Sequence, residues 1–153
     1  MSDEPVVIIG LGDIIRRIRY LGSNINDQSL MSEIGLFLIS QIQIRTAEGV
    51  DVDGNAFTPY SPGYALFRRR KGRSASRVNL FFTGSMMSAM TFEADSDEVT
   101  LFFQNTSDPS GTRNPAKAFF LNQERRFFAM SEEDRQGVLR IIDNHIDRLR
   151  RRR

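Results

Sequence analysis

Two short runs of alternating apolar and polar residues, joined by an acidic turn, constrain the fold of this chain more than any other feature. The first run covers residues 91–94, the turn residues 95–98 and the second run residues 99–104. A period of two residues is typical of a strand with one buried face, and a short turn joins neighbouring strands in antiparallel order. The pattern therefore predicts a β-hairpin and, with it, an antiparallel sheet.

Segments with helical periodicity lie on both sides of this hairpin. One is expected over residues 12–21, and a longer one from Asp27 or Ser29 to Ala47. A last helix is expected to begin after Ser131, because Ser131 and Asp134 have the spacing of a capping box. Further short elements are expected as strands over residues 6–9 and 78–82 and as helical segments over residues 64–71, 85–89 and 116–122.

This order of elements predicts an α+β fold rather than alternating βαβ units. We expect a small antiparallel sheet with flanking helices, an N-terminal helix pair and a long C-terminal helix. The length of 153 residues suits a single domain, residues 1–153, which ends in a basic C-terminal tail, residues 148–153.

The composition excludes several classes of function. The chain has no cysteine and one histidine, so a disulfide framework, a thiolate metal site and a two-histidine zinc site are excluded. No apolar run reaches the ~20 residues of a membrane-spanning helix. These absences argue against most hydrolase and metalloenzyme classes, and we expect no cofactor, no bound metal and no membrane association.

Three motifs suggest chemistry but are better explained by structure. Residues 7–12 resemble the start of a dinucleotide-binding fold, yet bulky Ile15 stands where close helix packing is required. Asp53-Gly54-Asn55 resembles part of a calcium loop, but its flanking ligands are out of register, which favours a turn. His145 has no nucleophile or orienting acid near it in sequence, so a partly packed helix residue is the simpler interpretation.

Arginine residues are concentrated in two blocks. An arginine side chain binds phosphate or carboxylate through a planar two-pronged contact, so each block is a candidate for contact with a protein partner or DNA. A solvated loop and a solvated helix end remain the alternatives. The candidate contact residues are Arg68, Arg69, Arg70, Lys71, Arg73, Arg77, Arg150, Arg151, Arg152 and Arg153.

Phenylalanine makes up 12 of the residues, and several occur as adjacent pairs. Adjacent residues on a strand point to opposite faces, so such a pair leaves one ring to be covered by a second layer or by another subunit. We favour a second subunit. The candidate subunit contacts are Phe81, Phe82, Phe102, Phe103, Phe127 and Phe128.

The order of several short motifs resembles that of a known family. The motifs are Asp53-Gly54-Asn55-Ala56-Phe57-Thr58-Pro59-Tyr60-Ser61, then Tyr64 and Lys71, then Val78-Asn79-Leu80, then Thr83-Gly84-Ser85-Met86, then Arg126-Phe127-Phe128-Ala129-Met130-Ser131. With the hairpin and the terminal helices, this series resembles the phage virion morphogenesis family. Its members are small tail-completion or head–tail joining proteins of tailed bacteriophages, including Mu-like phages.

The resemblance implies a structural virion protein that performs no catalysis. It would form a homo-oligomeric ring at the neck or tail end that completes the tail and joins it to the head. Its partners would be copies of itself and other neck, connector and tail proteins, with non-specific contact to DNA in the channel. The expected location is the virion, and the host cytoplasm during assembly. A basic nucleic-acid-binding protein remains the alternative.

Overall fold

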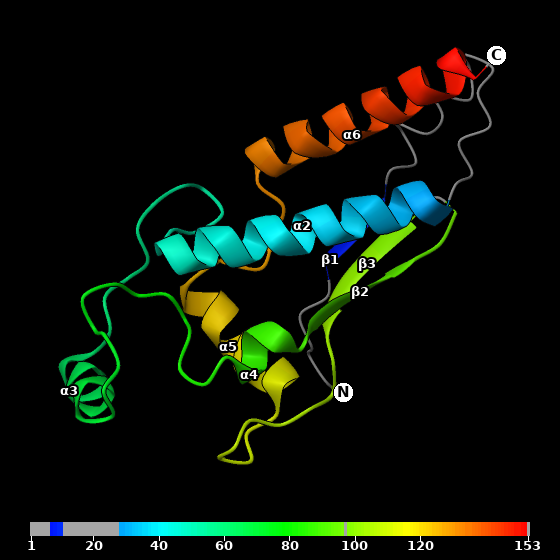
Figure 1. Cartoon of the computed structure of the whole chain (residues 1–153). Helices are drawn as coiled ribbons and strands as arrows, with labels where there is room; N and C mark the ends of the chain where they lie inside the picture. Colours follow the sequence, from blue (N-terminus) through cyan, green and yellow to red (C-terminus); the bar gives the residue numbers. More distant parts are fainter. Residues whose placement is uncertain (1–6, 11–27, 97, 153) are drawn as a thin grey trace.

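The computed structural model describes residues 7–10, 28–96 and 98–152. Within these ranges the elements are β1 (Val7–Gly10), α2 (Gln28–Glu48), α3 (Pro62–Arg70), α4 (Ser85–Ser88), β2 (Met90–Ala94), β3 (Glu98–Phe103), α5 (Asn114–Glu124) and α6 (Glu132–Arg151) (Figure 1). The predicted α+β fold with a long C-terminal helix is confirmed. The helix expected over residues 12–21, and therefore the N-terminal helix pair, lies outside the described residues.

The three strands form one antiparallel sheet in the order β1-β3-β2. Strands β2 and β3 pair from Met90↔Phe103 to Ala94↔Val99, which is the hairpin that the alternating pattern predicted. Strand β1 pairs antiparallel to β3. A dinucleotide-binding fold requires a parallel neighbour for its first strand, so this topology agrees with the rejection of that motif.

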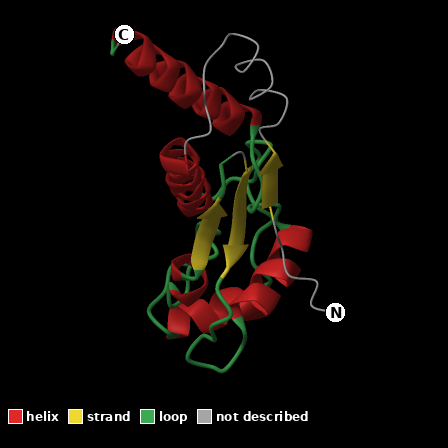
Figure 2. Ribbon diagram, turned by 90° about the vertical axis from the view of Figure 1, so that its right-hand side faces the viewer, coloured by secondary structure: helices red, strands yellow, loops and turns green. Residues whose placement is uncertain are grey.

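Helix α2 packs over the sheet, as Figure 2 shows from the side. Along β3 the side chains of Val99, Leu101 and Phe103 are buried, whereas those between them are half-buried. The facing stripe of α2 is almost fully buried and consists of Leu30, Met31, Ile34, Leu38 and Ile42. This helix–sheet interface is the centre of the hydrophobic core.

Helix α6 begins at the predicted capping box and packs on α2. The Ser131 side chain accepts a hydrogen bond from the backbone N–H of Asp134, and the Asp134 carboxylate accepts one from the backbone N–H of Ser131. The buried Asp134 also pairs with Arg45 of α2, with 2.7 Å between Nη1 and Oδ2. Arg45 Nη2 donates to the carbonyl of Ala129 at 2.8 Å, so one guanidinium fixes the start of α6 against α2.

The strand predicted over residues 78–82 is wrong. Leu80 has a positive φ of 56°, in the left-handed region that a strand cannot contain. The Asn79 side chain accepts a hydrogen bond from the backbone N–H of Phe81 at 3.1 Å, which closes a tight side-chain turn. Residues 78–82 are therefore an irregular segment, and the argument from opposite strand faces does not apply to Phe81 and Phe82. The helical segments predicted at 64–71, 85–89 and 116–122 are confirmed as α3, α4 and α5, with shifted ends.

Candidate functional site

Helix α3 is a short arm whose ends follow from local chemistry. The Ser61 side chain accepts a hydrogen bond from the backbone N–H of Tyr64 at 3.3 Å, and Pro62 stands in the first turn, where its missing N–H costs nothing. Arg68, Arg69 and Arg70 occupy the last turn, where cations are favoured by the helix dipole. In Figure 1 this arm lies beyond the C-terminal end of α2.

Arg68 is the one basic residue of the arm that is buried, with an exposed fraction of 2%. Its Nε donates to the carbonyl of Ser74 at 2.8 Å, and its Nη2 donates to the carbonyl of Phe81 at 3.0 Å. Within the described ranges no carboxylate forms an ion pair with this guanidinium. Arg68 is thus a buried cation whose hydrogen bonds in the described ranges all go to neutral oxygens.

Aromatic rings surround this guanidinium. Its Cζ lies 4.8 Å from the ring centroid of Tyr60, 5.9 Å from that of Tyr64 and 5.8 Å from that of Phe82. Phe67 joins the cluster by stacking on Phe82 with 5.6 Å between centroids. Ring faces attract a cation, and this attraction is strongest where water is excluded.

A second buried arginine, Arg125 at the end of α5, approaches the same tyrosine. Its Cζ lies 5.5 Å from the Tyr60 centroid. Its Nε donates to the carbonyl of Thr58 at 2.9 Å, and its Nη2 donates to that of Pro59 at 3.1 Å. Its Nη1 pairs with the exposed carboxylate of Glu124 at 3.0 Å. Arg125 therefore joins α5 to the loop that precedes α3.

Between these segments lies a cleft of about 580 Å³, which we call the α3–α5 cleft. It is lined by Thr58, Pro59, Tyr60, Ser61, Tyr64, Arg68, Leu80, Phe82, Lys117, Leu121, Glu124 and Arg125. Three of these side chains are cations and one is an acid. The walls are mainly aromatic and aliphatic, so the cleft combines apolar contact area with positive charge.

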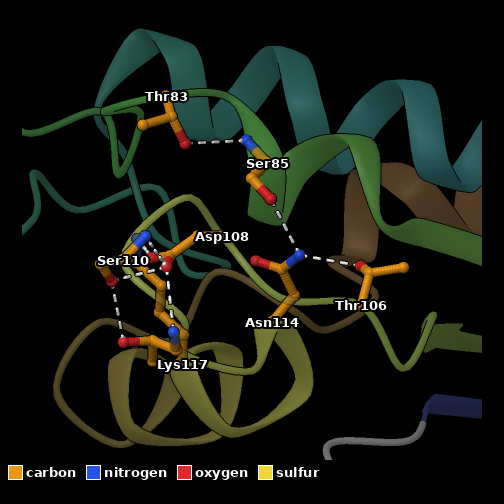
Figure 3. A network of polar contacts seen from close by, with 8 residues as sticks. Thr83, Ser85, Thr106, Asp108, Ser110, Asn114 and Lys117 are labelled. Atoms are coloured by element: carbon orange, nitrogen blue, oxygen red, sulfur yellow. Dashed lines mark hydrogen bonds and ion pairs between the residues drawn. The ribbon is translucent and has the colours of Figure 1, made fainter.

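Lys117 is positioned in this cleft by Asp108, in the network drawn in Figure 3. Its Nζ lies 3.3 Å from Asp108 Oδ2. The other oxygen, Oδ1, accepts from the Ser110 hydroxyl at 2.6 Å and from the backbone N–H of Thr112 at 3.0 Å. The Ser110 hydrogen bond, followed by those from Thr112 and Lys117, lowers the pKa of Asp108 from 3.8 to about 2.

The hydroxyl of Tyr60 has an unusual environment. It is buried, and it has no hydrogen-bond partner within the described part of the chain. A buried hydroxyl without a partner costs about 1–3 kcal/mol. Because this oxygen atom is closed off from solvent, the feature of the cleft that favours a negatively charged occupant is the guanidinium of Arg68, which lines the cleft and has no acidic partner in the described ranges. The arrangement can bind an anionic group that carries apolar neighbours.

The structure separates the predicted arginine contacts into two groups. Arg69, Arg70, Lys71, Arg73 and Arg77 are exposed on or next to the arm, and Arg150, Arg151 and Arg152 are exposed at the end of α6. Arg153 lies outside the described residues. Arg68 differs from both groups, because its side chain is almost fully buried, donates to backbone carbonyls and lines the α3–α5 cleft rather than the exposed face of the arm.

Three of the predicted subunit contacts also require correction. Phe103, Phe127 and Phe128 are almost fully buried in the core of the chain itself, so their rings are covered without a second subunit. Phe81 is exposed, and Phe82 and Phe102 are half-buried, so these three remain candidates.

Sequence reasoning missed Arg125, Lys117 and Tyr60 as members of one site. Tyr60 stood in the motif that carried the resemblance, but Arg125 and Lys117 lie far from it in sequence. No spacing rule connects side chains that are brought together only by tertiary packing.

The structure agrees with the interpretation of the Asp53-Gly54-Asn55 motif as a turn and of His145 as a partly packed helix residue. The Asp51 carboxylate accepts from the backbone N–H groups of Asp53 and Asn55, both at 2.9 Å, and Gly54 has a φ of 83°, so this segment is a turn. His145 is half-buried on α6. In the described ranges, no three acidic, histidine or cysteine side chains form a cluster that could bind a metal ion.

The chain matches no protein-family model, no curated protein and no solved structure. None of the helices in the described ranges has both the length and the hydropathy needed to cross a membrane.

Proposed function

We propose that this chain is a structural protein of a tailed bacteriophage virion. In this proposal it forms a ring at the neck or tail end, completes the tail and joins it to the head, after assembly in the host cytoplasm. The proposal rests on the ordered motifs that resemble the phage virion morphogenesis family and on the exposed apolar side chains of the folded chain.

Exposed apolar surface is the observation that carries the proposal. The large apolar side chains that remain exposed include Leu36, Ile44, Leu66, Phe67, Phe81 and Phe120. Leu36 and Ile44 are 63% and 50% exposed, and they lie two turns apart on one face of α2. Phe120 on α5 is 66% exposed. Exposed apolar residues that share one face of a helix are candidates for protein association, which suits a subunit that acts by contact with neighbours.

Self-association in solution is the first test. We expect the mass of the purified chain, measured by analytical ultracentrifugation, to rise with concentration over the micromolar range. Leu36→Ser and Phe120→Ser should each lower this association, whereas Ser40→Ala on the same exposed side of α2 should not.

Electron microscopy of particles that carry a labelled chain then tests the location. A strictly monomeric chain, or particles that form and infect without it, would contradict the proposal.

Nucleic-acid binding is the second candidate, and the exposed cations of the arm favour it. Arg69, Arg70 and Lys71 project from one end of the molecule next to the exposed ring of Phe67. Cations beside aromatic rings bind single strands through phosphate contact and base stacking. If this is the function, DNA binding will weaken steeply as salt rises, and removal of residues 150–153 will flatten that slope.

A further inference from the structure

Arg68 and two acidic side chains of the hairpin form a complementary set of unpaired charges. Arg68 is buried in the α3–α5 cleft and has no acidic partner in the described chain. Glu93 and Asp95 are exposed at the end of the β2–β3 hairpin, and their carboxylates make no hydrogen bond or ion pair with the described residues. We propose that the hairpin end of one copy, residues 93–95, docks into the α3–α5 cleft of the next copy. This inference rests on the proposed self-association and names its contact.

Buried charge in the cleft favours an anionic occupant. Arg68 and Arg125 both lie against the ring of Tyr60, and the single acid of the lining, Glu124, is 73% exposed and already paired with Arg125. A buried cation that lacks a counter-charge is costly unless an anion neutralises it. A carboxylate that enters the cleft would neutralise Arg68, which lines it.

The walls of the cleft favour a peptide over a nucleic-acid strand. Tyr64, Leu80 and Leu121 line it, and its charged groups are set among these apolar side chains. A phosphate backbone is usually bound by exposed cations along an open groove. A hairpin end brings carboxylates together with apolar neighbours such as Ala94, and such a pair of contacts suits this lining.

The positions of the two features allow a head-to-tail arrangement. The hairpin end lies beside the first residue of α2, because Gln28 Nε2 donates to the carbonyl of Ala94 at 3.2 Å. The arm lies beyond the opposite end of α2 (Figure 1). A helix of 21 residues spans about 30 Å, so the two surfaces do not contact each other within one copy. Two different surfaces at opposite ends form a heterologous contact, which generates a ring where the rotation closes.

Glu132 and Glu133, two further exposed acids of the described ranges, are poorer candidates. Glu132 accepts a hydrogen bond from Gln136 at 3.0 Å and lies near Arg135. Glu132 and Glu133 also stand in the first turn of α6, where the helix dipole stabilises them. Glu93 and Asp95 have no such compensation.

Two complementary variants test the contact. Glu93→Lys/Asp95→Lys reverses two charges of the hairpin end but leaves the cleft intact. Arg68→Met removes the one cation of the cleft that has no acidic partner in the described ranges but leaves the hairpin intact. By analytical ultracentrifugation, each variant alone should need about tenfold or more higher concentration to self-associate. Mixed in equal amounts, they should form a one-to-one heterodimer, because each still carries one working surface.

Matched controls separate this contact from general charge effects. Arg69→Met removes an exposed cation from the same helix, and Asp53→Lys reverses an exposed acid elsewhere, so both should assemble as the parent chain does. Circular dichroism checks that each variant is folded, and Lys117→Met is used in place of Arg68→Met if Arg68→Met unfolds.

Binding of a labelled single-stranded oligonucleotide is measured for the parent chain and for Arg68→Met.

The remaining outcomes of these experiments would overturn this inference alone or the proposed function with it. A parent chain that stays monomeric at every concentration overturns both the proposed function and this inference. Normal assembly of Glu93→Lys/Asp95→Lys, equal losses for Arg69→Met and Arg68→Met, or the absence of a heterodimer in the mixture overturns the inference alone. Oligonucleotide binding that Arg68→Met abolishes, with assembly unchanged, assigns the cleft to nucleic acid instead and also overturns it.

Discussion

Gly35 of α2 lies directly against the ring of Phe92 on β2. A Cβ atom added to Gly35 would lie 2.5 Å from Phe92 Cδ2 and 2.7 Å from its Cγ, which is closer than atoms can approach. The overlapping atoms belong to the base of the ring, close to the backbone of a paired strand. The absence of a side chain at Gly35 therefore sets how closely the helix approaches the sheet.

We expect Gly35→Ala to destabilise the fold. Alanine improves helix propensity by about 1 kcal/mol, but overpacking against a fixed ring costs about 1–3 kcal/mol. The net effect should be a lower urea midpoint with little change in slope. Phe92→Ala should reverse part of the loss in the double variant, because it removes the atoms that overlap.

Gly137→Ala provides the matched comparison. A Cβ atom there would meet the tip of the Phe37 ring, 2.2 Å from Cζ. Phe37 is only half-buried, so its ring can move away at a smaller cost than the base of Phe92 can. A larger loss for Gly137→Ala than for Gly35→Ala would contradict this explanation.

The ion pair between Arg45 and Asp134 is another interaction that we expect to stabilise the fold. We expect Arg45→Met to cost about 3–5 kcal/mol in the free energy of unfolding, because it leaves a carboxylate buried without its counter-charge. Asp134→Asn should also destabilise, through the lost ion pair and the weakened helix cap. In a double-mutant cycle measured by urea unfolding, the double variant should lose less than the sum of the two single losses. Additive losses would show that the two groups do not stabilise each other.

The sequence correctly predicted the elements whose patterns lie within a few neighbouring residues. Ser131 and Asp134 are three residues apart, and both hydrogen bonds of the predicted capping box form. The hairpin likewise follows from alternation around an acidic turn. In contrast, Phe127 and Phe128 are both buried because they lie in an irregular segment between α5 and α6, where the two-residue period of a strand does not apply.

The α3–α5 cleft was beyond sequence reasoning for a different reason. Its cations come from α3 and α5. Arg68 and Arg125 are held by backbone carbonyls of loops whose course depends on the whole fold, and Lys117 is held by Asp108. Arg68 belonged to a run of like charges, which predicts a solvated surface. One member of the run is buried because carbonyls of a following loop and of Phe81, next to the left-handed Leu80, accept from its guanidinium, and no local pattern predicts these contacts.

We expect Asp108 to make the free energy of unfolding depend on pH in the acid range. Its pKa is about 2 in the folded chain and 3.8 without these interactions, so its carboxylate stabilises the fold fully above pH about 4. This contribution should be lost as the pH falls from about 4 towards 2. Because other carboxylates titrate in the same range, the informative quantity is the difference in urea midpoint between the parent chain and Asp108→Asn. That difference should shrink as the pH falls through this window, and a difference independent of pH would contradict the assignment.

At the end of α5, we expect the geometry of the Arg125 side chain to matter more for stability than its positive charge. Its guanidinium donates through Nε and Nη2 to the carbonyls of Thr58 and Pro59. Arg125→Lys keeps the positive charge but replaces a rigid fork by a single ammonium, which cannot reach both carbonyls with the same geometry. We expect a loss of about 1–3 kcal/mol in the free energy of unfolding, because a hydrogen bond from a charged donor is lost. Arg126→Lys is the control, because the adjacent Arg126 side chain is exposed and should tolerate the change. Limited proteolysis should show faster cleavage in residues 58–61 of Arg125→Lys than of the parent chain, and equal rates would show that this loop is held by other contacts.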